Sequence, residues 1–346
     1  MRKTTLIGLL LLAFCAVCRY WSPAADFYAE RLYPWISGAL SWLGSLPRFS
    51  LEEFVVLGFV VTFVDQIVKA VKHREKFTSW LGNSLVTLMW LLVWFYMGWG
   101  NNYYRTGLYE RSGIRRTTYD ESAFQGFLEH YTNELALSAA EAGDYGREML
   151  EAEVKAFYTK EVTGWGYAPL RRWQHVKRPV WNRLFSAVSV QGYMGPFFSE
   201  SQVNRDVSEA EYPYVVAHEM AHLAGVTSEA EASFWGFEYC RGSANAAVRY
   251  SGYLALLPYV LQQANYLLSE EDYAALIDRI PEKAREDYTA DRENWKRLRI
   301  GWIDRIQSWM QDGMLKGNGV SEGRRDYFGV VSMIMTMDAA REKVEI

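Results

Sequence analysis

Residues 215–225 read VVAHEMAHLAG, and this stretch decides how the second half of the chain is interpreted. His218 and His222 are four residues apart, so a helix places both imidazoles on one face, where they can bind the same metal ion. The residues around them are mostly apolar, which predicts a buried helix, and Pro213 suits its first turn. Polar side chains on a buried helix need partners, and a shared metal ion is one such partner.

Glu219 completes the pattern H-E-x-x-H, which supplies two metal ligands and a general base. Its carboxylate lies about 100° around the helix from His218, beside the coordination position that a water molecule would take. Zinc held by nitrogen and oxygen ligands with one open position is the catalytic arrangement. The alternative is that His218 and His222 are core histidines hydrogen-bonded to their neighbours.

A third metal ligand is expected just beyond this helix. Gly225 can end the helix, and Ser228-Glu229-Ala230-Glu231 has the form of a capping box, with Ser228 as N-cap and Glu231 closing it. Glu229 then stands in the first turn of the next helix, close to His222. We expect Glu229 to be the third ligand and keep Glu231 as the alternative; plain helix capping would explain either residue.

The fold class is predicted to be mainly α, because the periodicity from residue 119 onward is mostly helical. One stretch differs: residues 185–204 hold β-branched and aromatic residues, two glycines and a proline, which predicts one or two strands just before the metal helix. Helices are expected at 120–143, 148–160, 246–264, 269–280 with Ser269 as N-cap, from Pro281 to about Gln311, and from about Arg324.

Three apolar segments precede this region, at 4–21, 54–71 and 79–99. Each approaches the roughly 20 residues that a helix needs to cross a bilayer. The alternative for the first is a cleaved signal peptide; for the second, which carries Asp65 and Gln66, it is a buried or interfacial helix. We expect residues 1–100 to form a membrane anchor with about three transmembrane helices, and residues 101–346 to form the domain outside it.

The basic residues predict the orientation, because positive charge favours the cytoplasmic side. Arg2 and Lys3 precede the first segment, and a cluster from Lys69 to Lys76 lies between the second and third. The chain is therefore expected to be a multi-pass protein of the cell membrane, with the lipid bilayer as a partner and residues 101–346 on the extracytoplasmic side. Five aromatic residues are expected at the interface or facing lipid: Trp80, Trp90, Trp94, Tyr96 and Trp99.

The composition argues against several other classes of protein. Of the 346 residues 50% are hydrophobic and 16% aromatic, which is enough for a core and argues against disorder. The net charge of −4 comes with no long basic block, so nucleic acid is not expected as a partner. Cys15, Cys18 and Cys240 form neither a disulfide framework nor a cysteine-based zinc site, and Cys240 is expected to be a small buried residue.

Several motifs together resemble a bacterial family known as domain of unknown function 3810. The likeness spans most of the chain and rests on GYMGPFFSESQVN (192–204), AHEMAHLAG (217–225), SEAEASF (228–234), RYSGYL (249–254) and LKGNGVSEGRRDYFGVV (315–331). The chain is also similar, more distantly, to the gluzincin peptidases, through H-E-x-x-H followed by Glu229 and Ala232. Ser233 stands where gluzincins usually have Asp or Asn. The metzincin pattern matches through Gly225 and then fails, because Ser228 occupies the place of its third histidine.

The resemblance implies a helical zincin-like metallopeptidase domain that binds Zn²⁺ through His218, His222 and Glu229. In zincin peptidases an edge strand beside the metal holds the substrate in extended form, and FFSESQVN (197–204) is the candidate for that strand. An ordinary strand or loop is the alternative. Asn204 and Tyr327 are the candidates for contact with the substrate or with an oxyanion; a core position is the alternative for Tyr327.

The expected function is that of a zinc metalloendopeptidase, which hydrolyses a peptide or protein substrate with Glu219 as general base. The alternative is a non-catalytic membrane scaffold or sensor in which zinc only staples two helices. Glu219 favours the enzyme, because a structural zinc site has no use for a base at that position. Hydrolysis of another amide, in a cell-wall or lipid substrate, stays open.

Overall fold

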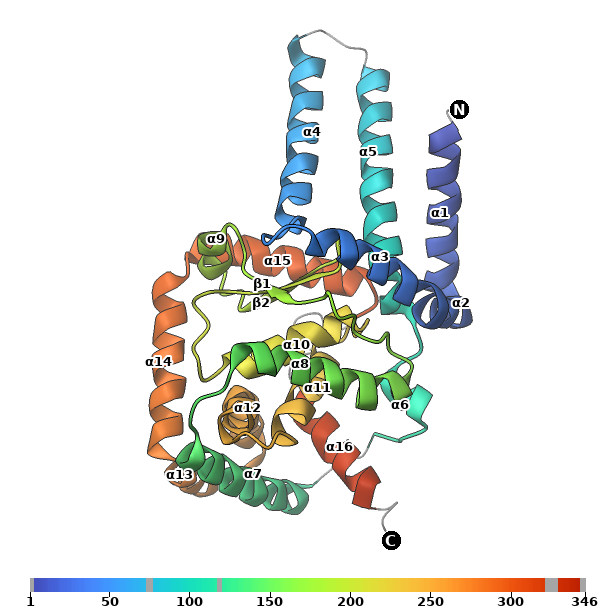
Figure 1. The fold of residues 1–346 in the computed structure, drawn as a ribbon. Helices are drawn as coiled ribbons and strands as arrows, with labels where there is room; N and C mark the ends of the chain where they lie inside the picture. The colour runs from blue at the N-terminus through green and yellow to red at the C-terminus, as the bar shows by residue number, and fades with distance from the viewer. Residues whose placement is uncertain (1–2, 73–76, 117–119, 321–328, 343–346) are drawn as a thin grey trace.

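The computed structural model describes residues 3–72, 77–116, 120–320 and 329–342, and it is mainly helical (Figure 1). Three long helices, α1 (Lys3–Tyr20), α4 (Glu52–Lys72) and α5 (Phe77–Gly98), coincide with the three predicted apolar segments. Each is long and apolar enough to cross a membrane. All three project from the same side of a helical domain (Figure 1).

The segment between the first two of these helices belongs to the core of that domain. The Tyr28 hydroxyl donates to the carbonyl oxygen of Met97 at 2.9 Å, and the Tyr33 hydroxyl donates to that of Leu223 at 2.8 Å. Both tyrosines are fully buried, so the segment packs against residues that lie far along the chain. It comprises α2 (Ser22–Phe27), the π-helix η1 (Tyr28–Leu32) and α3 (Tyr33–Ser45).

A small three-stranded sheet precedes the helix that carries His218 and His222; two of its strands fall within residues 185–204, as the sequence predicts, and the third lies outside that stretch. Its strands are β1 (Val176–Lys177), β2 (Gly192–Gly195) and β3 (Glu200–Val203), in the order β1-β3-β2. β3 pairs in parallel with β1 and antiparallel with β2. The prediction that residues 197–204 supply a free edge strand is therefore wrong, because β3 has a neighbour on each side. Within the described part of the chain, β1 and β2 are the two outer strands of this sheet.

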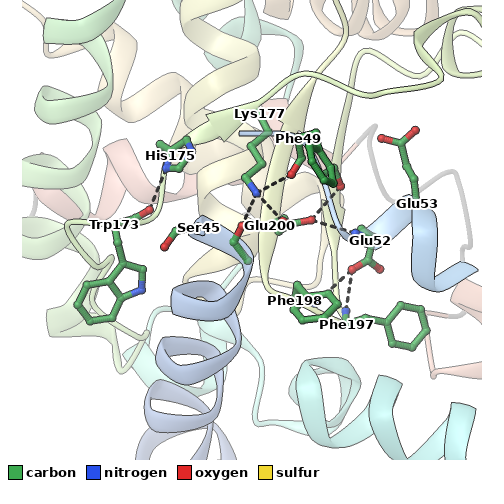
Figure 2. Close-up of polar contacts among 12 residues, drawn as sticks. Ser45, Phe49, Glu52, Glu53, Trp173, His175, Lys177, Phe197, Phe198 and Glu200 are labelled. Carbon is green, nitrogen blue, oxygen red and sulfur yellow. Dashed lines mark hydrogen bonds and ion pairs between the residues drawn. The ribbon is translucent and has the colours of Figure 1, made fainter. Parts of the chain in front are cut away.

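A buried polar network holds the start of α4 against this sheet (Figure 2). Lys177 Nζ donates to Glu200 Oε1 at 2.6 Å, and Glu200 Oε2 accepts the backbone N–H of Glu52 at 3.0 Å. Glu52 Oε2 in turn accepts the backbone N–H groups of Phe197 at 3.0 Å and Phe198 at 3.2 Å. Buried charges require such partners, so the network joins the base of a candidate span to the strands beside the metal helix.

Helices α8, α11 and α12 pack against α10, the helix that carries His218 and His222. Gly236 lets α11 approach it closely, since a Cβ there would lie 3.2 Å from the backbone nitrogen of His218. Cys240 is fully buried, as expected. The elements are η2 (Gly100–Tyr104), α6 (Leu108–Ser112), α7 (Glu121–Glu141), α8 (Arg147–Phe157), the π-helix η3 (Tyr158–Val162), η4 (Thr163–Trp165), α9 (Asn182–Ala187), α10 (Tyr212–Leu223), α11 (Glu229–Arg241), α12 (Ala246–Leu267), α13 (Glu270–Arg279), α14 (Glu282–Leu298), α15 (Gly301–Gly317) and α16 (Val330–Glu342).

Two predicted helices in the C-terminal part of the chain are not reproduced as expected: one is divided, and the start of the other is not described. The single helix expected from Pro281 to Gln311 is wrong, because Ile300 adopts an extended conformation that separates α14 from α15. Its backbone N–H donates to the carbonyl oxygen of Ala187 at 2.8 Å, a contact with α9 that sequence spacing does not reveal. The predicted start of the last helix at Arg324 lies outside the described residues.

Candidate metal centre

Helix α10, which carries the H-E-x-x-H pattern, is buried along most of its length. Every residue from Pro213 to Leu223 is buried, as the apolar sequence predicts. Gly225 then takes φ of +99°, a left-handed conformation that favours glycine, and the chain turns back. Ser228 caps α11, with its Oγ accepting the backbone N–H of Glu231 at 3.3 Å, so the predicted N-cap is confirmed.

This turn brings His218, His222 and Glu229 together. Glu229 Oε2 lies 3.3 Å from His218 Nε2 and 3.4 Å from His222 Nε2. The potential ligand atoms of the three residues all lie within 4.8 Å of one another. Two imidazole nitrogens and one carboxylate oxygen form a donor set that suits zinc and leaves a fourth position open.

The histidines are oriented through their other ring nitrogens. His222 Nδ1 lies 2.8 Å from the carbonyl oxygen of Val226, and His218 Nδ1 lies 3.4 Å from Ser233 Oγ. A hydrogen bond from the Nδ1 of a metal-binding histidine to a carbonyl is the usual way in which its tautomer is fixed. In this arrangement both Nε2 atoms face Glu229, so the residues present fit a bound metal ion.

Trp99, immediately beyond α5, supports the same helix. Its Nε1 donates to the carbonyl oxygen of His222 at 2.9 Å, and its ring meets the imidazole edge-on at a centroid distance of 6.2 Å. Trp99 is buried, so its expected place at the interface or against lipid is wrong. A candidate membrane span thus ends in direct contact with the candidate metal centre.

Glu231, the alternative ligand, has different partners. Its Oε1 accepts hydrogen bonds from the Tyr167 hydroxyl and, at 3.2 Å, from Trp235 Nε1. Arg111 Nη2 lies 3.9 Å from the same oxygen. The structure therefore places Glu229 with the two histidines and places Glu231 in a separate polar contact.

The general-base candidate Glu219 is buried against strand β2. A Cβ on Gly192 would lie 2.3 Å from Glu219 Oε1, so only a glycine allows the strand to approach the carboxyl group so closely. The sequence interpretation did not single out Gly192. The available signal was a glycine within the stretch 185–204 that is predicted to be extended, since a glycine in a strand often marks a close backbone approach.

The pKa values of the four site residues shift in different directions. Burial raises the pKa of Glu219 to about 8 and lowers the pKa of His218. Burial also opposes charge on His222 and Glu229, but their mutual attraction and hydrogen bonds outweigh it. The pKa of His222 therefore rises to about 9, and that of Glu229 falls well below its ordinary value.

These shifts predict that metal binding releases protons. Below pH 9 the metal-free protein holds a proton on His222, which a metal ion must displace to use that nitrogen. We expect release of at least one proton per zinc at pH 7, and an apparent affinity that rises by about tenfold per pH unit from pH 6 to 8. Titration calorimetry in buffers of different ionisation enthalpy measures this release; a binding heat independent of buffer would contradict it.

Asn204, one of the two residues expected to contact substrate or oxyanion, does not join this cluster. Asn204 is buried, and its Nδ2 donates to the carbonyl oxygen of Val190 at 2.9 Å and to Ser186 Oγ at 3.1 Å. Its Oδ1 accepts the backbone N–H of Asp206 at 2.9 Å. Asn204 thus stabilises its own loop. Tyr327 lies outside the described residues.

Two other tyrosines lie close to the site. The ring of Tyr214 lies 6.0 Å from that of His218, and the spacing of four residues on one helix could have indicated it. Tyr259, on α12, is near enough to Glu229 for this carboxylate to add to the effect of burial in raising the pKa of the phenol. No local pattern in the sequence connects Tyr259 with Glu229.

The fold and the site together define a mainly helical protein with three candidate membrane spans and a buried His-His-Glu cluster. A family model described as a protein of unknown function (DUF3810) matches residues 28–335. The chain therefore belongs to this family, which confirms the resemblance seen in the sequence motifs. No curated protein and no solved structure matches the chain.

Proposed function

We propose that the protein is a membrane-anchored zinc metallopeptidase that hydrolyses peptide bonds in a peptide or protein substrate. The observation that carries the proposal is the position of Glu219. Its buried carboxyl group is close enough to His222 and Glu229 to interact with them electrostatically, and it lies directly against strand β2. A metal site that only linked two helices would need neither a general base nor a substrate-binding strand at that point.

Each residue has a distinct role in this proposal. His218, His222 and Glu229 hold the metal, and Trp99 and Val226 keep His222 in place. A zinc ion held there would supply Lewis acidity to an attacking water molecule and to the substrate carbonyl. With the positive charge of the metal favouring its ionised form, Glu219 would accept a proton from the attacking water and pass it to the leaving amine.

Strand β2 is the proposed substrate-binding element, in place of residues 197–204. An extended peptide can add to the outer edge of a sheet through backbone hydrogen bonds. At Gly192 such a peptide would lie next to Glu219, because no side chain separates the strand from this carboxyl group. The position of β2 thus supports cleavage within an extended segment.

The second candidate is a scaffold or sensor in which the metal links α10 to α11. The contacts of His222 with Val226 and Trp99 are the observation that favours the scaffold, because they would also stabilise a structural metal site. Zinc-dependent hydrolysis of an amide in a cell-wall or lipid substrate is a third candidate, and it uses the same residues.

The direct test is the full-length protein purified in lipid nanodiscs, with its metal content and its cleavage of unfolded peptide libraries measured together. The proposal expects about one zinc per chain and cleavage that a chelator abolishes and added zinc restores. Zinc without cleavage of any peptide, amide or lipid substrate would favour the scaffold.

The membrane topology is part of the proposal and has its own test. If α1, α4 and α5 all span the membrane, the positive cluster from Lys69 to Lys76 stays cytoplasmic and the domain lies outside. A reporter joined after residue 110 should then be active only if it is of the kind that works after export. A cytoplasmic reporter that is active at this position would reverse the orientation.

A further inference from the structure

Helix α15 (Gly301–Gly317) has its polar and apolar faces reversed relative to a helix on a water-soluble surface. Its partly buried positions include the polar residues Asp304, Gln307 and Gln311 beside Ile303, and Leu315 alone among its residues is fully buried. The large apolar residues face outward, and Trp309 is 78% exposed. A surface helix in water shows the opposite pattern. The outward-facing apolar residues are Trp302, Ile306, Trp309, Met310 and Met314.

Helix α3 (Tyr33–Ser45) repeats this reversal in a distant part of the chain. Its buried face is built largely from small residues, namely Ser37, Gly38, Ser41 and Gly44. Its exposed face carries Trp35, Trp42 and Leu43, and Leu46 and Phe49 follow in the next turn of chain. Two helices that lie far apart in the sequence, α3 ending at Ser45 and α15 beginning at Gly301, therefore present tryptophan and aliphatic side chains to the outside.

Both helices lie on the side of the domain from which α1, α4 and α5 project, across the bases of these spans (Figure 1). α3 also belongs to the chain segment between α1 and α4, so the two spans restrict it to this side. Tryptophan is enriched where membrane meets water. Arg305 and Lys316 are exposed on α15 as well, and long basic side chains at this level can extend to lipid headgroups.

We propose that α3 and α15 lie in the membrane interface, with their tryptophan-rich faces in the outer part of the bilayer that α1, α4 and α5 cross. This inference rests on the membrane anchoring proposed above and adds a contact made by the C-terminal part of the domain. The bilayer is the occupant because the two faces adjoin the spans. Apolar surface of this kind needs an apolar environment.

The arrangement limits the substrate of the proposed enzyme. Trp99 connects the end of α5 to His222, and α15 holds the domain against the lipid from a second point. The metal centre is thus kept at a short, fixed distance from the membrane surface. Segments of membrane-tethered polypeptides close to that surface are the substrates that this placement favours.

The test uses the full-length protein in nanodiscs with an environment-sensitive fluorophore on a single new cysteine. Trp309→Cys probes α15 and Trp42→Cys probes α3, so failure of one variant to fold leaves the other. Leu137→Cys is the matched control, because Leu137 is an exposed apolar residue, 51% exposed, on α7 at the opposite end of the domain (Figure 1). The wild-type chain, whose three cysteines are buried, measures background labelling.

Each labelled protein is exposed to iodide in the buffer and to phospholipid with a nitroxide near the headgroup end of its acyl chain. The proposal expects the labels at 309 and 42 to lose most of their emission to the lipid quencher and little to iodide, with the reverse at 137. Quenching by iodide at both membrane-side positions would overturn it. Protection from both quenchers would also overturn it, because protein rather than lipid would then cover these faces. If the wild-type protein has no peptidase activity, the proposed enzymatic function is refuted, while the quenching result still tests the membrane contact of α3 and α15.

Discussion

Glu219→Gln is expected to keep its zinc and to lose 10²–10⁴-fold in the rate of peptide hydrolysis, the usual cost of removing a general base. The amide matches the carboxyl group in size, so it fits against Gly192 as the native side chain does. It is also neutral, like the protonated carboxyl group that burial favours in the metal-free site. The variant should therefore fold. Metal content, melting temperature and kcat/KM are to be measured on the same preparation.

Glu211→Gln is the matched control, because it makes the same chemical change at the N-cap of the same helix. Burial and the neighbouring Asp291 raise the pKa of Glu211 well above its ordinary value, so an amide should replace it with little effect on rate. If Glu219→Gln hydrolysed peptides as fast as the control, the general-base role would be refuted. Full biological function of Glu219→Gln in the cell would make the zinc-stapled scaffold the better account.

The local parts of the site could be predicted because their information is local. The spacing of His218 and His222 determines which face of a helix they share. The capping pattern that begins at Ser228 places Glu229 in the first turn of the next helix. The structure has this cap and brings Glu229, rather than Glu231, to the histidines.

The parts that could not be predicted depend on contacts between distant segments. Composition makes Trp99 resemble a lipid-facing residue, yet it hydrogen-bonds to His222, 123 residues away. The strand pattern around residues 192–203 does not reveal which strand is central, because pairing with β1 decides this. The break at Ile300 likewise depends on its contact with Ala187. Periodicity describes which face of an element is apolar, and it carries no information on what that face meets.

Helices α3 and α15, whose large apolar side chains face outward, also show that periodicity does not reveal what an apolar face contacts. Their sequences are amphipathic, and a soluble fold would be expected to bury the apolar side. In the structure the large tryptophan, isoleucine and methionine side chains of these helices are exposed, while small residues of α3 and Leu315 with several polar residues of α15 lie on the inner side. Only the arrangement of the helices in the folded domain reveals this exposed apolar surface.

Glu229→Gln is expected to lower zinc affinity by more than about 100-fold, because even the loss of an outer-shell partner of a metal ligand typically costs 10–100-fold. The amide is a poorer ligand for a cation, and it also removes the negative charge that faces both histidines. Without that charge the pKa of His222 should fall, so the metal-free variant should release fewer protons on binding zinc at pH 7. Competition with a zinc-binding dye measures the affinity.

Glu231→Gln is the control for Glu229→Gln, because it removes a buried carboxylate from the same helix without removing the proposed metal ligand. It removes the charge that faces Arg111 and weakens the hydrogen bonds from Tyr167 and Trp235. Hydrogen bonds to a charged group contribute about 1.5–3 kcal/mol, so this variant should be less stable but should bind zinc as the wild type does. The reverse result, with zinc lost in Glu231→Gln and retained in Glu229→Gln, would show that the third ligand is Glu231 while leaving the proposed chemistry intact. Equal and undiminished zinc in both variants would mean that the metal binds elsewhere.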